Sequence, residues 1–393
     1  MALKFFLCLV LLFFMSCNKE DVERVSTDVC TPILFDIVGV EDQSGTSRGL
    51  IETTQSLQHA CKPADQNGGG QSIGLWADRM EGNETEFNIL GNNTSIIYNP
   101  NVQGGNPYNS WNYEGEAKLW RDSDQNPDNG ILDKGVYKFR AYYPKSVNVV
   151  ESSDATHFVV DYNTALMQED LLVAYKLVDA SVFDLYTPVP LRFKHALAAV
   201  RFQMKFKEGY MESDALTSFW LQNGTSQDFS YIGMMVYGLF DEHTQQVEPE
   251  GIEWTESAQR PWYQKMYHWE NSKGVPFENK EGVQTVATAY TDEVHATHGE
   301  LFSKNDGWVL IIPQKSPGTV TMNFTTQKGG SSVYTIQLPK ITGTDEKGEN
   351  PSGEYYLPGY RYTYTVTLTK THADVTLGIA PWNELDSSFD IPY

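Results

Sequence analysis

Basic residues, cysteines and enzyme signatures are all scarce in this sequence of 393 residues. Lysines and arginines number 29 against 51 aspartates and glutamates, so the formal net charge is −22. Such a charge repels phosphate backbones and excludes nucleic acid as a partner. The signatures of serine hydrolases, phosphate-binding loops, dinucleotide-binding folds and metalloproteases are also absent. We therefore expect no enzyme and no cofactor. The paired carboxylates of a glycosidase would leave no such signature, but nothing in the sequence supports them.

Apolar runs long enough to cross a membrane are lacking too. The longest candidate, Phe5–Met15, follows a positive charge and precedes Ser16 and Cys17. This is the layout of a secretory signal, and it is shorter than the roughly 20 residues that a membrane span needs. A cysteine at this place resembles the lipobox of bacterial lipoproteins, in which the thiol is acylated. We expect a lipoprotein signal peptide over residues 1–16 and a tether over residues 17–30.

The residues after Cys17 indicate where such a lipoprotein would reside. Asn18–Asp21 combines a lysine with acidic residues. It resembles the tether that sends lipoproteins of the Bacteroidota to the outer leaflet of the outer membrane, although a solvated linker is the alternative. We expect a surface-exposed lipoprotein of the cell outer membrane, held there by its acyl chains.

The four cysteines allow a single disulfide after processing. Cys8 would leave with the signal peptide and Cys17 would carry the lipid, so Cys30 and Cys61 remain. An even pair in an oxidising compartment suits a disulfide. A bridge also demands Cα atoms about 4.4–6.8 Å apart, which no sequence can establish. The sequence is compatible with a Cys30–Cys61 disulfide and equally with two free thiols.

Alternating apolar residues dominate the rest of the chain, and helical periodicity is scarce. The alternation predicts strands around Ile33–Ile37, Tyr137–Tyr143, Leu191–Leu197, Val200–Phe206, Val320–Phe324, Tyr334–Leu338, Tyr360–Leu368 and Val375–Ile379. The continuous apolar run Trp308–Ile312 predicts a strand that is covered on both faces. We therefore expect an all-β fold, with two tandem β-sandwich domains over residues 31–186 and 187–393.

One phase change interrupts the alternation. Apolar positions are odd-numbered up to Leu197 and even-numbered from Val200 onward. An extra residue at Ala198 and Ala199 would produce this change, so we expect a β-bulge there. A short helical turn is the alternative, because alanine favours helices.

Several short aromatic motifs follow one another along the chain in an order typical of one protein family. They are Ile33–Phe35 with Ser47–Gly49, Trp111–Tyr113 with Leu119–Trp120, Tyr137–Pro144, Gln168–Ala174, Leu191–Leu197, Pro358–Tyr362 and Ile379–Trp382. In this order they resemble the fimbrillin (Mfa-like) family of the Bacteroidales, the subunits of type V pili. The residues from Tyr210 to Gly307 carry no matching motif. The resemblance implies two transthyretin-like β-sandwich domains and a role in cell adhesion.

The resemblance also implies a route of assembly. In that family an Arg-specific protease removes the first strand, and a strand from another pilus subunit replaces it. The cut would fall between Arg48 and Gly49, within the small and polar stretch Ser44–Gly49 that suits protease access. An ordinary surface arginine is the alternative, and Arg24 is a less informative cut site. Removing an edge strand leaves unpaired backbone groups and apolar surface, and strand addition satisfies both.

Two features oppose simple polymerisation. A Cys30–Cys61 disulfide would keep the released strand tied to the body, which favours an anchor, a tip or a non-polymerising relative. Asn383–Tyr393, the residues after Trp382, are a short segment to donate.

An acidic loop supplies one candidate metal site. Asp122, Asp124, Asn126, Asp128 and Asp133 have a spacing close to that of an EF-hand calcium loop. In this sequence Pro127 occupies the position at which an EF-hand loop needs glycine. The last candidate ligand, Asp133, is aspartate where an EF-hand has glutamate. A turn-rich acidic loop explains the pattern equally well, so we expect no resident metal.

The aromatic residues leave one rival function open. Nine tryptophans and 22 tyrosines could stack on sugars in a surface glycan-binding lipoprotein of the outer membrane. Core and cross-strand packing is the simpler explanation for these aromatics. We therefore expect a structural or accessory pilus subunit, with a glycan or protein on a host or bacterial surface as a further partner.

Overall fold

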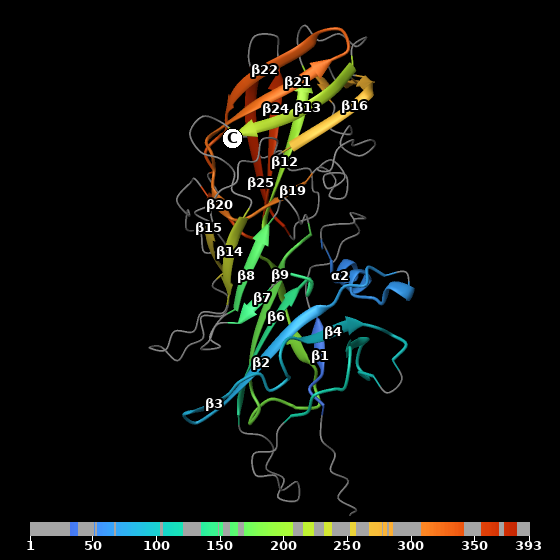
Figure 1. Ribbon diagram of the computed structural model, residues 1–393, viewed down its shortest axis with the longest axis vertical. Helices are drawn as coiled ribbons and strands as arrows, with labels where there is room; N and C mark the ends of the chain where they lie inside the picture. Colours follow the sequence, from blue (N-terminus) through green and yellow to red (C-terminus); the bar gives the residue numbers. More distant parts are fainter. Residues whose placement is uncertain are drawn as a thin grey trace, which may run out of the picture.

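The structure is a computed structural model. It describes residues 32–37, 51, 53–66, 68–102, 105–120, 135–147, 149–151, 158–163, 169–206, 215–223, 232–237, 252–256, 267–276, 278–280, 283–285, 308–341, 355–368 and 373–382. Strands dominate these residues (Figure 1), so the predicted all-β fold class is confirmed. The division into two transthyretin-like domains stays a prediction.

The first half of the chain forms most of a seven-stranded sheet. In spatial order its strands are β11 (Phe193–His195), β9 (Leu172–Asp179), β6 (Val136–Tyr143), β2 (Ile73–Glu81), β4 (Thr94–Tyr98) and β5 (Trp111–Tyr113), with β3 (Glu84–Glu86) beside β2. One face of this sheet carries an apolar core that includes Leu75, Phe139 and Leu172. The short parallel pair β1 (Phe35–Ile37) and β10 (Val189–Leu191) packs into this core.

A helix that the alternation did not predict contributes to the same core. Helix α2 (Thr54–Ala60) begins where Thr53 Oγ1 accepts a hydrogen bond from Ser56 N at 3.0 Å, which is an N-cap. Leu57 is its buried residue. The 3-10 turn η1 (Ala64–Gln66) follows. At seven residues the helix is too short for periodicity to show in the sequence.

The opposite face of the seven-stranded sheet is covered as well. Its apolar residues pack in one cluster with Val160 and Tyr162 of a four-stranded sheet, whose order is β15 (Ile252–Glu256), β14 (Ile232–Tyr237), β8 (Phe158–Asn163) and β7 (Val149–Glu151). Lys138 and Arg140 of β6 are both buried. The Arg140 guanidinium lies 2.7 Å from the Asp78 carboxylate.

The rest of the chain encloses a second core. One sheet has the order β17 (Glu278–Lys280), β18 (Val283–Thr285), β12 (Ala198–Phe206), β24 (Tyr360–Leu368) and β25 (Ala373–Pro381), with β19 (Val309–Ile311) beside β12. The other has the order β16 (Tyr267–Pro276), β13 (Ala215–Asn223), β21 (Thr319–Thr326) and β22 (Gly330–Gln337). The strands β20 (Gln314–Lys315) and β23 (Tyr355–Tyr356) form a separate two-stranded sheet. Phe202, Tyr364, Met322 and Ile336 meet in the core between the two sheets.

The predicted β-bulge at Ala198 and Ala199 is wrong. Strand β11 pairs with β9, whereas β12 pairs with β19 and β24, so the chain leaves one sheet and enters another at this point. Residues 196–200 are buried on every side because the packing between the sheets surrounds them. The phase change therefore marks a passage between two sheets.

Strand pairing crosses residue 187, the predicted domain boundary. Strands β10 and β11 pair with β1 and β9, and β14 pairs with β8. Each pair joins strands from opposite sides of residue 187. In the part of the chain that is described, no helix has the length and apolar character of a membrane span.

Three buried tyrosines predict a loss of stability at alkaline pH. Burial raises the pKa of Tyr356 to about 12 and also raises the pKa values of Tyr362 and Tyr364. The Oη atoms of Tyr356 and Tyr364 lie 2.8 Å apart. Because the unfolded chain loses these protons near pH 10 and the folded chain keeps them, the free energy of unfolding should fall as pH rises above 10.

Urea unfolding at pH 9 and pH 11 measures this loss. In Tyr364→Phe the free energy of unfolding should fall less steeply with pH, because phenylalanine has no proton to lose. The difference in slope should correspond to about one proton. An unchanged pH slope in that variant would contradict the assignment.

Candidate functional site

The site is built around the first strand, β1. Its residues Phe35, Asp36 and Ile37 lie beside Val189, Pro190 and Leu191 of β10 in a parallel pair. Val189 N donates to Leu34 O at 2.7 Å. Although about 150 residues separate the two strands, β1 is held by the body of the protein rather than by its sequence neighbours.

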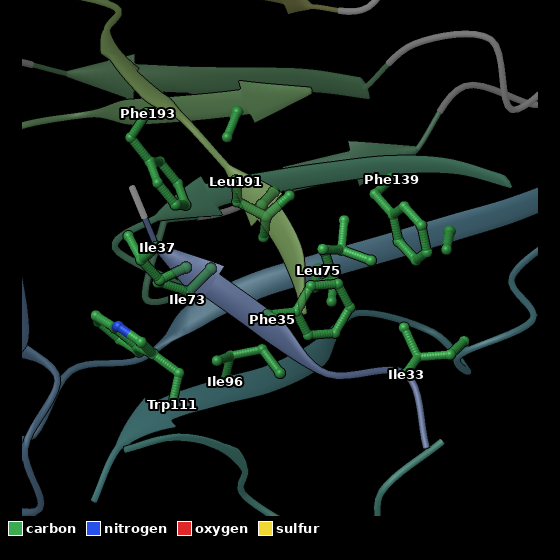
Figure 2. Close-up of a cluster of buried hydrophobic side chains, with 14 of the residues drawn as sticks. Ile33, Phe35, Ile37, Ile73, Leu75, Ile96, Trp111, Phe139, Leu191 and Phe193 are labelled. Carbon is green, nitrogen blue, oxygen red and sulfur yellow. The ribbon is translucent and has the colours of Figure 1, made fainter. Parts of the chain in front are cut away.

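The side chains of this segment are buried at alternate positions. Ile33, Phe35 and Ile37 are 0%, 2% and 3% exposed and belong to the core of the seven-stranded sheet. Figure 2 shows the three side chains among Ile73, Leu75, Phe139 and Phe193. The Phe35 ring meets the rings of Tyr113 and Phe139 edge-on, with centroids 5.9 and 5.5 Å away. The segment therefore completes the core.

Mainly side chains bind the second edge of the segment Ile33–Ile37, together with one backbone carbonyl. The Nδ2 atoms of Asn106 and Asn109 both donate to Phe35 O at 3.1 Å. Tyr113 Oη donates to Ile33 O at 2.9 Å, and Ile33 N donates to Lys118 O at 2.8 Å. We call Asn106, Asn109, Tyr113, Lys118 and β10 together the β1 site.

Most of these hydrogen bonds reach the backbone of β1 and are independent of its sequence. Asn109 Nδ2 adds one contact to a side chain, 3.2 Å from Asp36 Oδ1. The β1 site thus combines apolar burial at alternate positions with backbone hydrogen bonds. These are the two features by which proteins bind an added β-strand.

Ile51 is the first residue after β1 that the structure describes. Its backbone N donates to Asp170 Oδ2 at 3.1 Å, within the interior. His195 Nδ1 lies 2.8 Å from the same carboxylate oxygen, and the His195 ring stacks on Trp382 with centroids 4.2 Å apart. His195 is therefore a buried packing residue, as its place on an apolar strand face predicts.

The predicted cut site, Arg48 and Gly49, lies outside the described residues, as does Cys17. It falls in the sequence between Ile37 and Ile51, which are both fixed to the body. Cleavage at this bond remains a prediction.

The predicted disulfide is likewise untested, since Cys30 lies outside the described residues. Cys61 carries a buried free thiol in the same core as Phe35. Burial raises the pKa of the Cys61 thiol, which keeps it protonated and unreactive at neutral pH.

The candidate calcium ligands, Asp122 to Asp133, also lie outside the described residues. Among the residues that are described, no three histidine, cysteine or acidic side chains cluster in a way that could hold a metal ion. The calcium site stays a hypothesis.

Sequence reasoning missed the two asparagines and Asp170. The stretch from Asn99 to Asn109 is rich in asparagine, but that composition predicts only a loop. The clustering of asparagines before the aromatic strand β5 is the one sequence signal that could have indicated these hydrogen-bonding side chains. For Asp170 no sequence signal exists, because Ile51 lies 119 residues away.

The described tryptophans offer no exposed ring for stacking on a sugar. Trp76, Trp111, Trp120, Trp308 and Trp382 are all buried. Packing explains these tryptophans, which are those whose side chains are described.

Comparisons with known proteins agree with this fold. The model of the fimbrillin-like family matches residues 63–382. A fimbrial protein from Bacteroides vulgatus has the same fold, with a TM-score of 0.50 at 13% sequence identity over 89% of this chain and 99% of that one. The tip fimbrial protein Mfa3 from Porphyromonas gingivalis, truncated at its C-terminus, aligns with a TM-score of 0.32 at 12% identity over 79% of this chain and 94% of that one. A search of curated proteins gave no match. The family model matches most of the length of this chain. The chain therefore belongs to the fimbrillin-like family.

Proposed function

We propose that this protein is a structural or accessory subunit of a type V pilus, non-enzymatic, and that it assembles by exchange of its first strand. The observation that carries the proposal is the way in which β1 is held. Ile33, Phe35 and Ile37 fill the core, and the surrounding hydrogen bonds reach mainly the backbone of the segment. Another strand with suitable apolar spacing could replace these contacts.

The location of the predicted cut supports the same proposal. Cleavage after Arg48 would separate β1 from the body, while Ile51 would keep its hydrogen bond to Asp170. A departing β1 would expose apolar core and unpaired backbone groups, which favours capture of a replacement strand. The partners are accordingly other pilus subunits.

Export and anchoring belong to the proposal as well. Removal of residues 1–16 would place an acylated Cys17 in the outer membrane, with residues 17–30 as tether and the β-domains of residues 31–186 and 187–393 outside the cell. The anchor would hold the chain only until cleavage at Arg48, because Cys17 lies on the released side. Cleavage would therefore free the body from the membrane at the step that opens the β1 site.

An arginine substitution tests the proposal. In Arg48→Ala, treatment with an Arg-specific protease should leave β1 in place, and the ladder of assemblies that resist SDS should disappear. The matched variant Arg24→Ala alters an arginine in the tether and should retain the ladder. Mass spectrometry of the N-terminus should find acylated Cys17 before treatment and Gly49 after it. A ladder that persists in Arg48→Ala would refute assembly through this cut.

A further inference from the structure

The segment Ile33–Ile37 is held in different ways at its two ends. At the first end, Ile33 N donates to Lys118 O at 2.8 Å, and Ile33 O accepts a hydrogen bond from Tyr113 Oη at 2.9 Å. The donor and the acceptor of one residue are thus both paired with the body. In the sequence this end continues into the proposed tether, residues 17–30.

Toward the second end, two side-chain amides hold the segment. The Nδ2 atoms of Asn106 and Asn109 both donate to Phe35 O at 3.1 Å. Asn109 Nδ2 also lies 3.2 Å from Asp36 Oδ1, where the carboxylate charge strengthens the contact. Along the chain, these contacts lie between those of Ile33 and the predicted cut.

Hydrogen bonds within one short stretch fix the position of the two amides. Asn109 Oδ1 accepts from Trp111 N and from Asn106 Nδ2, both at 2.9 Å. Asn106 N donates to Asn112 Oδ1 at 2.7 Å. Gly105 lies against the same oxygen, because a Cβ added there would be 2.4 Å from Asn112 Oδ1. The two amides are therefore oriented by this stretch as well as by β1 itself.

We propose that Asn106 and Asn109 form a latch that sets how long a strand stays in the β1 site. The inference rests on the proposed function, because β1 leaves only after the chain is cut. Cleavage after Arg48 would give β1 a free end on the side of Ile37, while Ile33 stays joined to the tether. A strand with one free end peels from that end, since each step there breaks only the next contact. The latch therefore opens first, and the contacts of Ile33 break last.

This order of release has a kinetic signature. A contact that is already broken in the transition state for release affects the rate of release when it is removed. A contact that still holds in the transition state affects the rate of binding instead, because its removal destabilises the bound strand and the transition state equally. The latch should therefore control release, and Tyr113 should control binding. A replacement strand enters in the reverse order, beginning beside Tyr113 and ending when the latch closes.

Release and binding rates test this order. The full chain is cut after Arg48 under reducing conditions, and an excess of a peptide of residues 31–39 traps the emptied site. The rate at which the N-terminal fragment separates from the body gives release, and a fluorescent form of the peptide gives binding. Asn109→Ala should speed release about tenfold, as expected for the loss of one charge-assisted donor, and leave the binding rate unchanged. Tyr113→Phe should slow binding by about fivefold and change release by less than about twofold.

Matched variants separate the latch from general effects on folding. Asn101→Ala changes an exposed asparagine of the same asparagine-rich stretch and should alter neither rate. Gly105→Ala should displace Asn112 and speed release, as Asn109→Ala does. Asp36→Ala removes one contact of Asn109 without changing the body. Combined with Asn109→Ala, it should speed release no further, because the contact is already absent.

Three outcomes would count against the latch. Release that Tyr113→Phe speeds as much as Asn109→Ala, or more, would overturn the proposed order. Release that neither Asn109→Ala nor Gly105→Ala changes would refute the latch and leave strand exchange standing. A cut chain that keeps its N-terminal fragment and binds no peptide would overturn strand exchange and the inference together.

Discussion

Replacing Phe35 by alanine in the uncut chain should lower the free energy of unfolding by about 3–5 kcal/mol, the range for deleting a buried aromatic ring. The ring is 2% exposed and contacts Tyr113 and Phe139 edge-on. The surrounding strands belong to one hydrogen-bonded sheet, so they cannot close fully around the cavity. Urea unfolding followed by intrinsic fluorescence measures the change.

The matched control is Val182→Ala, an apolar truncation at a residue that is 82% exposed. It should change stability by no more than about 0.5 kcal/mol. The cut form gives a second check, since a strand that is held less tightly should leave its site faster. If Phe35→Ala cost no more than the control, β1 would not complete the core and strand exchange would lose its physical basis.

The second large effect concerns Asp170. Asp170→Ala should lower the free energy of unfolding by about 3–5 kcal/mol, as expected when one partner of a buried polar pair is removed. The carboxylate is fully buried and contacts both Ile51 N and His195 Nδ1. Without it, a buried amide and a buried imidazole lose the group that compensates for their desolvation.

Glu169→Ala is the matched control, because Glu169 is the adjacent acidic residue and its side chain is exposed. Its removal should cost less than about 1 kcal/mol. In hydrogen exchange, Asp170→Ala should also increase exchange of the Ile51 amide, and Glu169→Ala should not. Equal stability losses in the two variants would contradict the role assigned to the buried carboxylate.

Several strands with one or both faces apolar were predicted, although the buried strands β2 and β9 were not. The alternation in Tyr137–Tyr143 and Tyr360–Leu368 and the continuous run Trp308–Ile312 correspond to β6, β24 and β19. Periodicity succeeds here because a pleated strand places successive side chains on opposite faces. It failed at Ala198 and Ala199, where the chain passes between two sheets, because a phase change looks the same for a bulge and for a change of sheet.

The candidate site was predictable only in part. The apolar spacing of Ile33, Phe35 and Ile37 indicated a buried first strand, and the motif order indicated that this strand could be exchanged. The partners of the strand could not be inferred. Val189 in β10 and the amides of Asn106 and Asn109 are distant in sequence, and loop asparagines are common for local reasons.

The amino-acid sequence by itself determined the all-β class, some of the strands, the negative net charge and the family, because these follow from local periodicity, composition and the order of motifs. Tertiary structure alone decided which edge of β1 pairs with β10, which side chains bind its other edge, and that a buried carboxylate holds Ile51. These contacts join residues that are far apart in the chain. Their geometry depends on how several sheets pack together, and no local pattern encodes that arrangement.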